Sequence, residues 1–202
     1  MKKMKTGGLE QALEKAVCAL ASTIEYHDPF TAAHQVQVTR LACRLAKELN
    51  LSAERTTGLR VAGIIHDLGK VYLPVEIASK PCPLTPAEME IVMGHPQLGC
   101  DIIKEVKFPW PVQKIILQHH ERLDGSGYPR GLKGRAIILE SRIMAVADVM
   151  QAIVSQRPYR PGLGLNRARE VIIEGRGARY DPEVVDACLD LFKRKRFSFD
   201  RP

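Results

Sequence analysis

The sequence predicts an all-α fold, and three observations support this class. Apolar residues recur at intervals of three and four along most of the 202 residues, which is the spacing of a buried helix face. Residues that favour helix starts precede several of these stretches. Only residues 136–139 suit a strand, and that strand would be short.

The first three helices follow directly from this spacing. Apolar positions over residues 9–24 predict the first helix. Thr31 is placed to cap the second helix, whose apolar positions include Val36. Ser52 is placed to cap the third helix, which we expect to stop near Gly69.

Prolines and glycines divide the rest of the chain. Four prolines make residues 74–86 an expected crossing loop, and Thr85 with Glu88 then forms the pattern of a capping box that starts another helix. Glycine and proline recur too often in residues 121–138 for a helix, so we expect a loop there. The remaining helices are expected over residues 97–106, 111–119, 140–155, 165–174 and 182–195.

The composition fits one globular domain. The chain is 45% apolar and 26% charged, and its length is sufficient for a full hydrophobic core. We expect this domain over residues 9–195, with tails at 1–8 and 196–202. The net charge of +7 suits an anionic partner, whether a nucleotide, a nucleic acid or a lipid headgroup.

The sequence predicts neither a membrane span nor a secretion signal. No stretch approaches about 18 uninterrupted apolar residues, and charged residues interrupt positions 9–23. The five cysteines include no CxxC pair, which argues against a zinc ribbon. The expected location is therefore a reducing cytoplasm.

A histidine–aspartate doublet ends the third predicted helix. His66 and Asp67 follow an apolar run, where a charged carboxylate is costly unless it is paired or bound to a metal. Lys70 lies one helical turn further on and could form that pair. From these residues alone, an ion pair and a metal site are equally good interpretations.

Two other positions point more strongly to a metal. His119 and His120 are adjacent, and neighbours on a helix diverge by about 100°, so at most one of them could face an ordinary core. Asp148 stands alone in an almost wholly apolar helix, which favours a ligand or a paired charge. Histidine and carboxylate ligands suit Mn, Fe or Zn. His34 is a weaker candidate, and the doublet 27–28 falls at a helix boundary.

Residues 119–129 read HHERLDGSGYP and resemble the HHExxDGxGYP signature of HD-GYP domains. Residues 66–70, HDLGK, resemble the HD-x-GK element of the same family. Supporting matches lie at residues 28–31, 94–96, 147–149, 157–160 and 180–183. The resemblance covers roughly residues 9–192 and implies a single HD-type helical bundle with a Gly-rich signature loop.

The resemblance also implies a pair of metal ions. Asp67 would bridge them, with His34, His66 and Asp148 completing one site and His95, His119 and His120 completing the other. Phe30 stands where some relatives hold a third metal with a glutamate, so two ions are expected. Fe and Mn are the expected metals, with Zn, Ni or Co as alternatives.

The activity implied by the resemblance is hydrolysis of cyclic di-GMP to pGpG, GMP or both, through a hydroxide activated by the two metals. Some relatives act on cyclic GMP-AMP instead. Asp67 and Lys70 match catalytic positions, and Arg157, Arg160 and Lys70 match positions that contact substrate. A cyclic dinucleotide is thus favoured over nucleic acid as the anionic partner.

In relatives, the signature loop is also tied to docking of diguanylate cyclase partners. Its residues here are Asp124, Gly125, Gly127, Tyr128 and Pro129.

Some positions depart from the family pattern. Gln151 and Val154 stand where an acid and a Ser or Thr are common, and Arg135 stands where an acid is common. Two other functions stay open: a different HD-type nucleotide phosphohydrolase, and a non-catalytic module that binds a cyclic dinucleotide. The chain has almost no residues for a sensor domain, so we expect a stand-alone enzyme or an excised catalytic domain.

Overall fold

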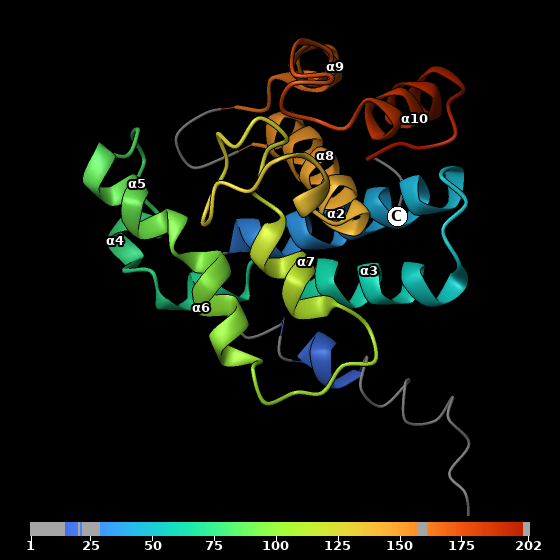
Figure 1. Ribbon diagram of the computed structural model, residues 1–202. Helices are drawn as coiled ribbons and strands as arrows, with labels where there is room; N and C mark the ends of the chain where they lie inside the picture. Colours follow the sequence, from blue (N-terminus) through green and yellow to red (C-terminus); the bar gives the residue numbers. More distant parts are fainter. Residues whose placement is uncertain (1–14, 20, 22–28, 157–160, 200–202) are drawn as a thin grey trace, which may run out of the picture.

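The computed structural model describes residues 15–19, 21, 29–156 and 161–199, with side chains from residue 33 onward in the second of the long helices' segments. It confirms the all-α class, because the described residues form helices and connecting loops with no strand (Figure 1). Residues 15–19 and 21 are helical. The helices that follow are α2 (Pro29–Glu48), α3 (Ala53–Ile65), α4 (Val75–Ala78), α5 (Pro86–Met93), α6 (His95–Ile102), α7 (Val112–Gln118), α8 (Leu139–Val154), α9 (Gly164–Glu174) and α10 (Pro182–Lys193), with short 3₁₀ turns η1 (Leu68–Tyr72) and η2 (Gly134–Ala136).

Two predicted helix starts are confirmed by their caps. The Ser52 side chain accepts a hydrogen bond from the Arg55 backbone N–H at 3.2 Å and begins α3. Thr85 and Glu88 form the predicted reciprocal capping box at the start of α5. The cap fixes where α5 begins, and α5 leads directly into α6.

Other sequence predictions were wrong in detail. Helix α2 begins at Pro29, two residues before the predicted cap Thr31, because proline is well suited to a first helical turn. Val36 is 57% exposed, since the buried face of α2 instead carries polar groups that belong to the functional site. Residues 136–139 form the end of η2 and the start of α8 rather than a strand, and the proline-rich segment contains the short helix α4.

Helices α2 and α8 form the centre of the molecule. Helix α2 packs on α3 and α8, while α8 also packs on α7, α9 and α10. The fully buried side chains include Leu41 and Leu45 on α2 and Ile143 and Met144 on α8. This central packing holds α2, α3, α7 and α8 as one body.

Two glycines bring neighbouring segments unusually close. A Cβ on Gly63 would lie 2.6 Å from Thr39 Oγ1, so its absence lets the end of α3 approach α2. A Cβ on Gly69 would lie 2.0 Å from the His95 carbonyl oxygen and 2.6 Å from the Gly99 backbone nitrogen. Backbone contact between η1 and α6 therefore sets the distance from Asp67 to His95.

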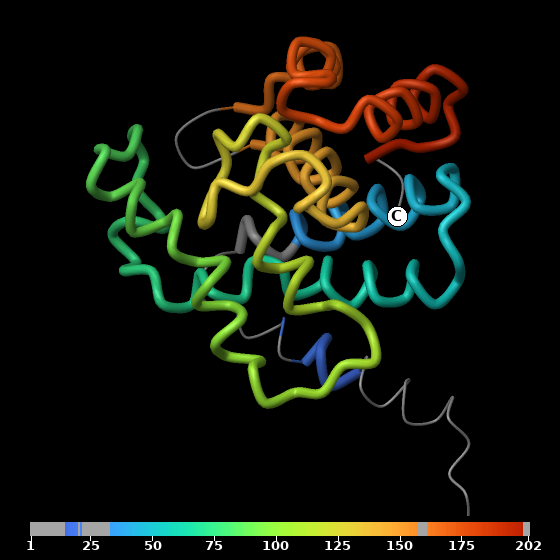
Figure 2. The backbone as a smooth tube through the Cα atoms, in the orientation of Figure 1, coloured from blue at the N-terminus to red at the C-terminus, as the bar shows by residue number. Residues whose placement is uncertain are grey.

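The segment between α7 and α8 is the predicted Gly-rich loop (yellow in Figure 2). It is tied to the segment before α10 by a hydrogen bond from the Leu123 N–H to the Arg179 carbonyl oxygen at 3.1 Å. A second bond, from the Gly134 N–H to the Leu123 carbonyl oxygen at 3.0 Å, closes the loop on itself. Among the helices that the structure describes, none is both long and apolar enough to cross a membrane.

Candidate metal centre

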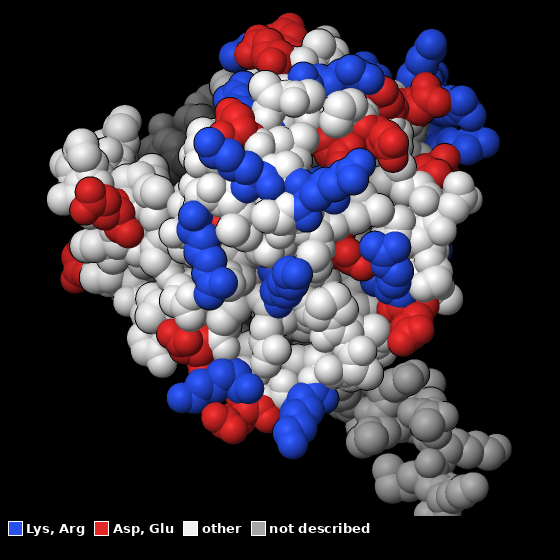
Figure 3. Space-filling view, in the orientation of Figure 1, with Lys and Arg blue, Asp and Glu red and all other residues white. Residues whose placement is uncertain are grey.

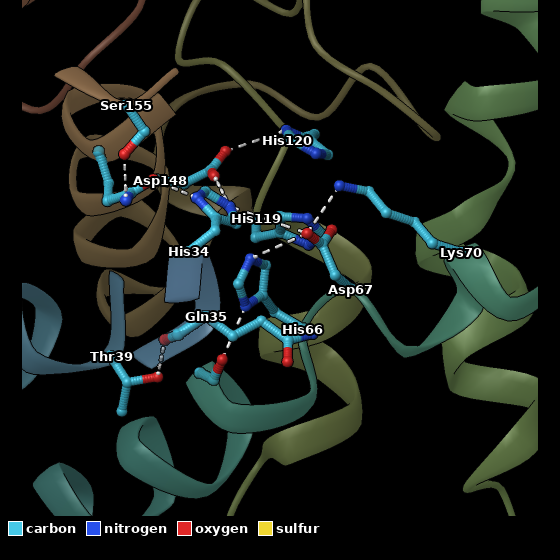
Figure 4. A network of polar contacts seen from close by, with 12 residues as sticks. His34, Gln35, Thr39, His66, Asp67, Lys70, His119, His120, Asp148 and Ser155 are labelled. Atoms are coloured by element: carbon cyan, nitrogen blue, oxygen red, sulfur yellow. Dashed lines mark hydrogen bonds and ion pairs between the residues drawn. The ribbon is translucent and has the colours of Figure 1, made fainter. Parts of the chain in front are cut away.

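The structure brings the predicted ligand side chains together in one place, although they come from distant parts of the sequence (Figure 4). We call this set the His/Asp cluster; its members are His34, His66, Asp67, His95, His119, His120 and Asp148. They lie on α2, at the end of α3, at the start of α6, at the end of α7 and on α8. The central packing of these helices is thus what positions the cluster.

Asp67 lies at the middle of the cluster. Its Oδ2 is 3.6 Å from His66 Nε2 and 3.8 Å from His34 Nε2, while its Oδ1 is 3.3 Å from His95 Nε2. Two groups of side chains have donor atoms close enough to hold an ion, and Asp67 belongs to both. One group is His34, His66 and Asp67, and the other is Asp67, His95, His119 and His120.

Asp148 connects the two groups from the α8 side. Its Oδ1 is 3.1 Å from His34 Nε2, and its Oδ2 is 3.7 Å from His120 Nδ1. His95 Nε2 and His119 Nε2 approach to 3.3 Å. The donor atoms therefore face one another across a small shared volume.

Three of the histidines are oriented by their own backbone. The Nδ1 atoms of His66, His95 and His119 lie 2.6–2.7 Å from the carbonyl oxygens of Gly63, Val92 and Ile116. These contacts place the ring proton on Nδ1 and leave the Nε2 lone pair directed into the cluster, as a metal ligand requires. His66 Nε2 is buried and has no hydrogen-bond partner, which a metal ion would supply.

His34 is oriented by a side chain instead. It lies inside the long helix α2, and its Nδ1 hydrogen-bonds to Gln151 Oε1 on α8. Gln151 Nε2 in turn donates to Ser155 Oγ at 2.6 Å. Gln151 is the functional residue that sequence reasoning placed only as a departure; the signal for it was its position three residues after Asp148, on the same face of α8.

Replacing Gln151 should weaken metal binding without unfolding the protein. In Gln151→Leu, His34 loses the group that fixes its ring, and loss of such a partner typically lowers metal affinity about 10–100-fold. In Gln151→Glu, a carboxylate can accept from both His34 and Ser155, so affinity should be kept or increased. Competition with a chelator measures the affinity, and equal affinities for the parent and both variants would contradict this role.

Burial keeps the cluster's histidines neutral. Burial first, and then His66 and His95, lowers the pKa of His119 to about 3. The pKa values of His66 and His120 are also lowered, chiefly by burial. Neutral imidazole is the form that binds a metal, so no proton has to be displaced from these rings near pH 7.

The two carboxylates are held in the charged form. Burial alone would raise the pKa of Asp67, but Lys70, His66 and His95 hold it well below its usual value. Burial likewise opposes ionisation of Asp148, and contacts with His34 and His120 hold its pKa well below its usual value. Neutral nitrogen donors with ionised carboxylates form a donor set that suits Mn, Fe or Zn.

The cluster opens to solvent on one side. The side chains of His34 and Asp67 are each 2% exposed, whereas those of His120 and Lys70 are 16% and 22% exposed. Lys70 Nζ donates to Asp67 Oδ2 at 2.7 Å, which is the predicted ion pair. Figure 4 shows Lys70 reaching the cluster from η1. A ligand can therefore approach from the side of Lys70 and His120.

A buried glutamate holds the signature loop in place. Glu121 is 2% exposed, and its carboxylate accepts the backbone N–H groups of Arg130 at 2.8 Å and Leu132 at 2.9 Å. A Cβ on Gly127 would lie 2.4 Å from the His120 carbonyl oxygen, so only glycine fits there. The loop is thereby folded back against His120.

The other signature residues have distinct positions. The Tyr128 ring lies 4.7 Å from the His120 ring, and burial raises its pKa so that the phenol stays protonated. Asp124 Oδ1 accepts from the Ser126 N–H and hydroxyl at 2.9 and 2.7 Å, and Gly125 has a φ of 84°. Pro129 is exposed at the end of the loop. Asp124 and Gly125 thus shape the turn, while Tyr128 lies beside the His/Asp cluster.

The predicted substrate-contacting arginines are not placed by the structure. Arg157 and Arg160 lie outside the described residues, as does His27. The side chain of Phe30, which stands where relatives hold a third metal, is also not described.

Comparison with known proteins gives a consistent result. Residues 19–184 match the family model described as an HD domain. The cyclic di-GMP phosphodiesterase response regulator RpfG of Xanthomonas campestris pv. campestris is 39% identical over 183 residues, covering 90% of this chain and 48% of that protein. The 3'3'-cGAMP-specific phosphodiesterase 1 of Vibrio cholerae is also 39% identical over 183 residues, covering 90% of this chain and 42% of that protein.

A solved HDG"Y"P protein from Bdellovibrio bacteriovorus has the same fold, with a TM-score of 0.70 at 21% identity over 91% of this chain and 62% of that chain. The chain spans about half the length of the curated relatives it matches. Since the family model spans most of the sequence and residues 119–129 carry the complete signature, the chain belongs to the HD domain family and to its HD-GYP group.

Proposed function

We propose that this chain is a metal-dependent phosphodiesterase that hydrolyses a cyclic dinucleotide, with cyclic di-GMP as the first substrate to test. The observation that carries the proposal is the shared carboxylate: Asp67 belongs to both groups of donor atoms in the His/Asp cluster. A carboxylate common to two sites is what a dinuclear hydrolytic centre needs. We propose that residues 9–195 form this catalytic domain.

His34, His66 and Asp148 would hold one ion with Asp67, and His95, His119 and His120 would hold the other. When bound, divalent ions of this kind polarise phosphoryl oxygens and lower the pKa of water, so that a nucleophile is present near neutral pH. We propose Fe or Mn as the metals, because the donor set combines imidazole nitrogens with carboxylate oxygens.

Hydrolysis adds the oxygen of water to phosphorus, breaks the bond from phosphorus to the 3′ oxygen, and leaves a proton on that oxygen. The first cleavage of cyclic di-GMP gives pGpG, and a second gives GMP. Lys70 is positioned on the open side of the cluster, where its ammonium group can stabilise negative charge on the phosphoryl oxygens. Tyr128 stays protonated, so it can donate a hydrogen bond but cannot act as a base.

The similarity to relatives named for cyclic di-GMP and for cyclic GMP-AMP supports a cyclic dinucleotide as the substrate class. Arg157 and Arg160 are proposed to contact it, since arginine suits both phosphate groups and guanine edges. We propose the cytoplasm as the location, where cyclic dinucleotides act as messengers. The signature loop, with Arg130, Lys133 and Arg135 exposed, is proposed to dock a diguanylate cyclase.

The test is anaerobic purification with metal quantification, followed by incubation with cyclic di-GMP and with cyclic GMP-AMP and chromatography of the products. We expect about two metal equivalents and linear or mononucleotide products. Metal binding without turnover of either substrate would favour a non-catalytic module. Turnover of other nucleotides alone would favour a different HD-type phosphohydrolase.

Replacing Lys70 should separate catalysis from metal binding. We expect Lys70→Met to lower turnover by about 10²-fold, because a positive charge that stabilises the transition state is lost, while metal content stays at the parent level. Lys107→Met is the control, since Lys107 is an exposed lysine away from the cluster. Parent-level turnover in Lys70→Met would show that this lysine serves only as the ion-pair partner of Asp67.

A further inference from the structure

A second cavity lies away from the His/Asp cluster, where α2, α9, α10 and the segment after α10 meet. It has a volume of about 610 Å³ and contains none of the cluster's residues. It is lined on α2 by Arg40, six residues after His34, which is about 9 Å further along the helix. A volume of this size is within the range of small-molecule sites in proteins.

Four cations from three segments line this cavity, and no acidic residue does. They are Arg40 on α2, Arg169 on α9, and Lys195 and Arg196 after α10. Arg196 pairs with Glu48 at 3.5 Å. Within the described part of the chain, the Arg169 and Lys195 side chains make no hydrogen bond or ion pair. Figure 3 shows Lys and Arg side chains gathered at the edge of the molecule near α10.

Aromatic rings form another part of the cavity wall. Phe192, Phe197 and Phe199 line it, and their ring centroids lie 5.2–5.7 Å apart. The Arg40 guanidinium lies 5.5 Å from the centre of the Phe197 ring. Three of the five phenylalanines in the chain are therefore in this one place, beside the cations.

We propose that this cavity binds a purine nucleoside 5′-monophosphate. Arg169 and Lys195 would contact the phosphate, because these cations can donate to its oxygens and are not paired with another described residue. The phenylalanine cluster would contact the base, since stacking on aromatic rings is a common way to bind a purine. A bound anion would also offset the repulsion among the converging cations.

The experiment is equilibrium dialysis of the full chain with GMP, repeated with inorganic phosphate and with guanosine. Using Asp67→Asn protein alongside the parent separates this cavity from the His/Asp cluster, so the result does not depend on the proposed catalytic function. We expect one saturable GMP site in Asp67→Asn protein. Arg169→Gln with Lys195→Gln should weaken GMP binding about 100-fold, or about tenfold for each charged contact.

A matched control changes two exposed cations elsewhere, Lys114→Gln with Arg135→Gln, and should leave GMP affinity unchanged. Phe199→Leu should weaken GMP binding several-fold while leaving inorganic phosphate binding intact. The proposal is overturned if GMP shows no saturable site in Asp67→Asn protein, or if the control lowers affinity as much as the cavity variant does.

Discussion

Asp67→Asn protein should lose both metal ions and at least about 10²–10³-fold of its turnover. The substitution keeps the size of the side chain but replaces the carboxylate with a neutral amide that has a single acceptor oxygen. In the native chain both carboxylate oxygens are used: Oδ1 faces His95, while Oδ2 faces His66 and Lys70. Because Asp67 belongs to both groups of donor atoms, one change should affect both ions.

Metal analysis of purified protein checks this expectation, with Asp101→Asn as the control. Asp101 is an exposed aspartate on α6 that accepts a hydrogen bond from Gln97 at 3.0 Å, so its loss should change neither metal content nor turnover. Asp67→Asn protein that still holds two metal equivalents would contradict the bridging role.

Gly69→Ala should disrupt the same centre through the backbone. The added Cβ would lie 2.0 Å from the His95 carbonyl oxygen and 2.6 Å from the Gly99 nitrogen, and neither backbone atom can move alone. Helix α6 must therefore shift away from η1 and take His95 with it. We expect a loss of at least about 3 kcal/mol in the free energy of unfolding, at the upper end of the usual cost of overpacking.

Thermal unfolding should show a fall in Tm of about 10 °C, and the remaining folded protein should bind fewer metal ions. The matched control is Gly94→Ala, beside His95 itself. Its Cβ would meet only the Ile91 carbonyl oxygen, at 3.3 Å, with an ordinary φ of −76°. If both variants melt at the parent temperature, the close approach of η1 and α6 does not constrain the site.

The helices and the members of the cluster could be predicted from sequence because each rests on a local signal. Helical spacing identified α3 and α8, and the lone acid in α8 pointed to Asp148. The shared position of Asp67 followed from family resemblance rather than from spacing. No local pattern places His34 beside Asp148, since that contact depends on how α2 packs against α8.

Several features could not be predicted because tertiary contacts decide them. The hydrogen bond from His34 to Gln151 joins positions 117 residues apart. Val36 has the apolar character of a core residue, yet the polar residues His34 and Gln35 occupy the buried face of α2. The close contact of Gly69 with α6 is likewise invisible in the sequence, where Gly69 reads only as a helix stop.

The way the histidines are held has a consequence for the order of assembly during folding. His66, His95 and His119 each bond to a carbonyl oxygen three residues earlier, so their rings are oriented as soon as the local turn forms. His34 acquires its orientation only when α8 docks, and contacts between distant positions form late. A newly made chain therefore presents three prepared rings before the fourth is fixed, and an ion captured at that stage would help to recruit α8.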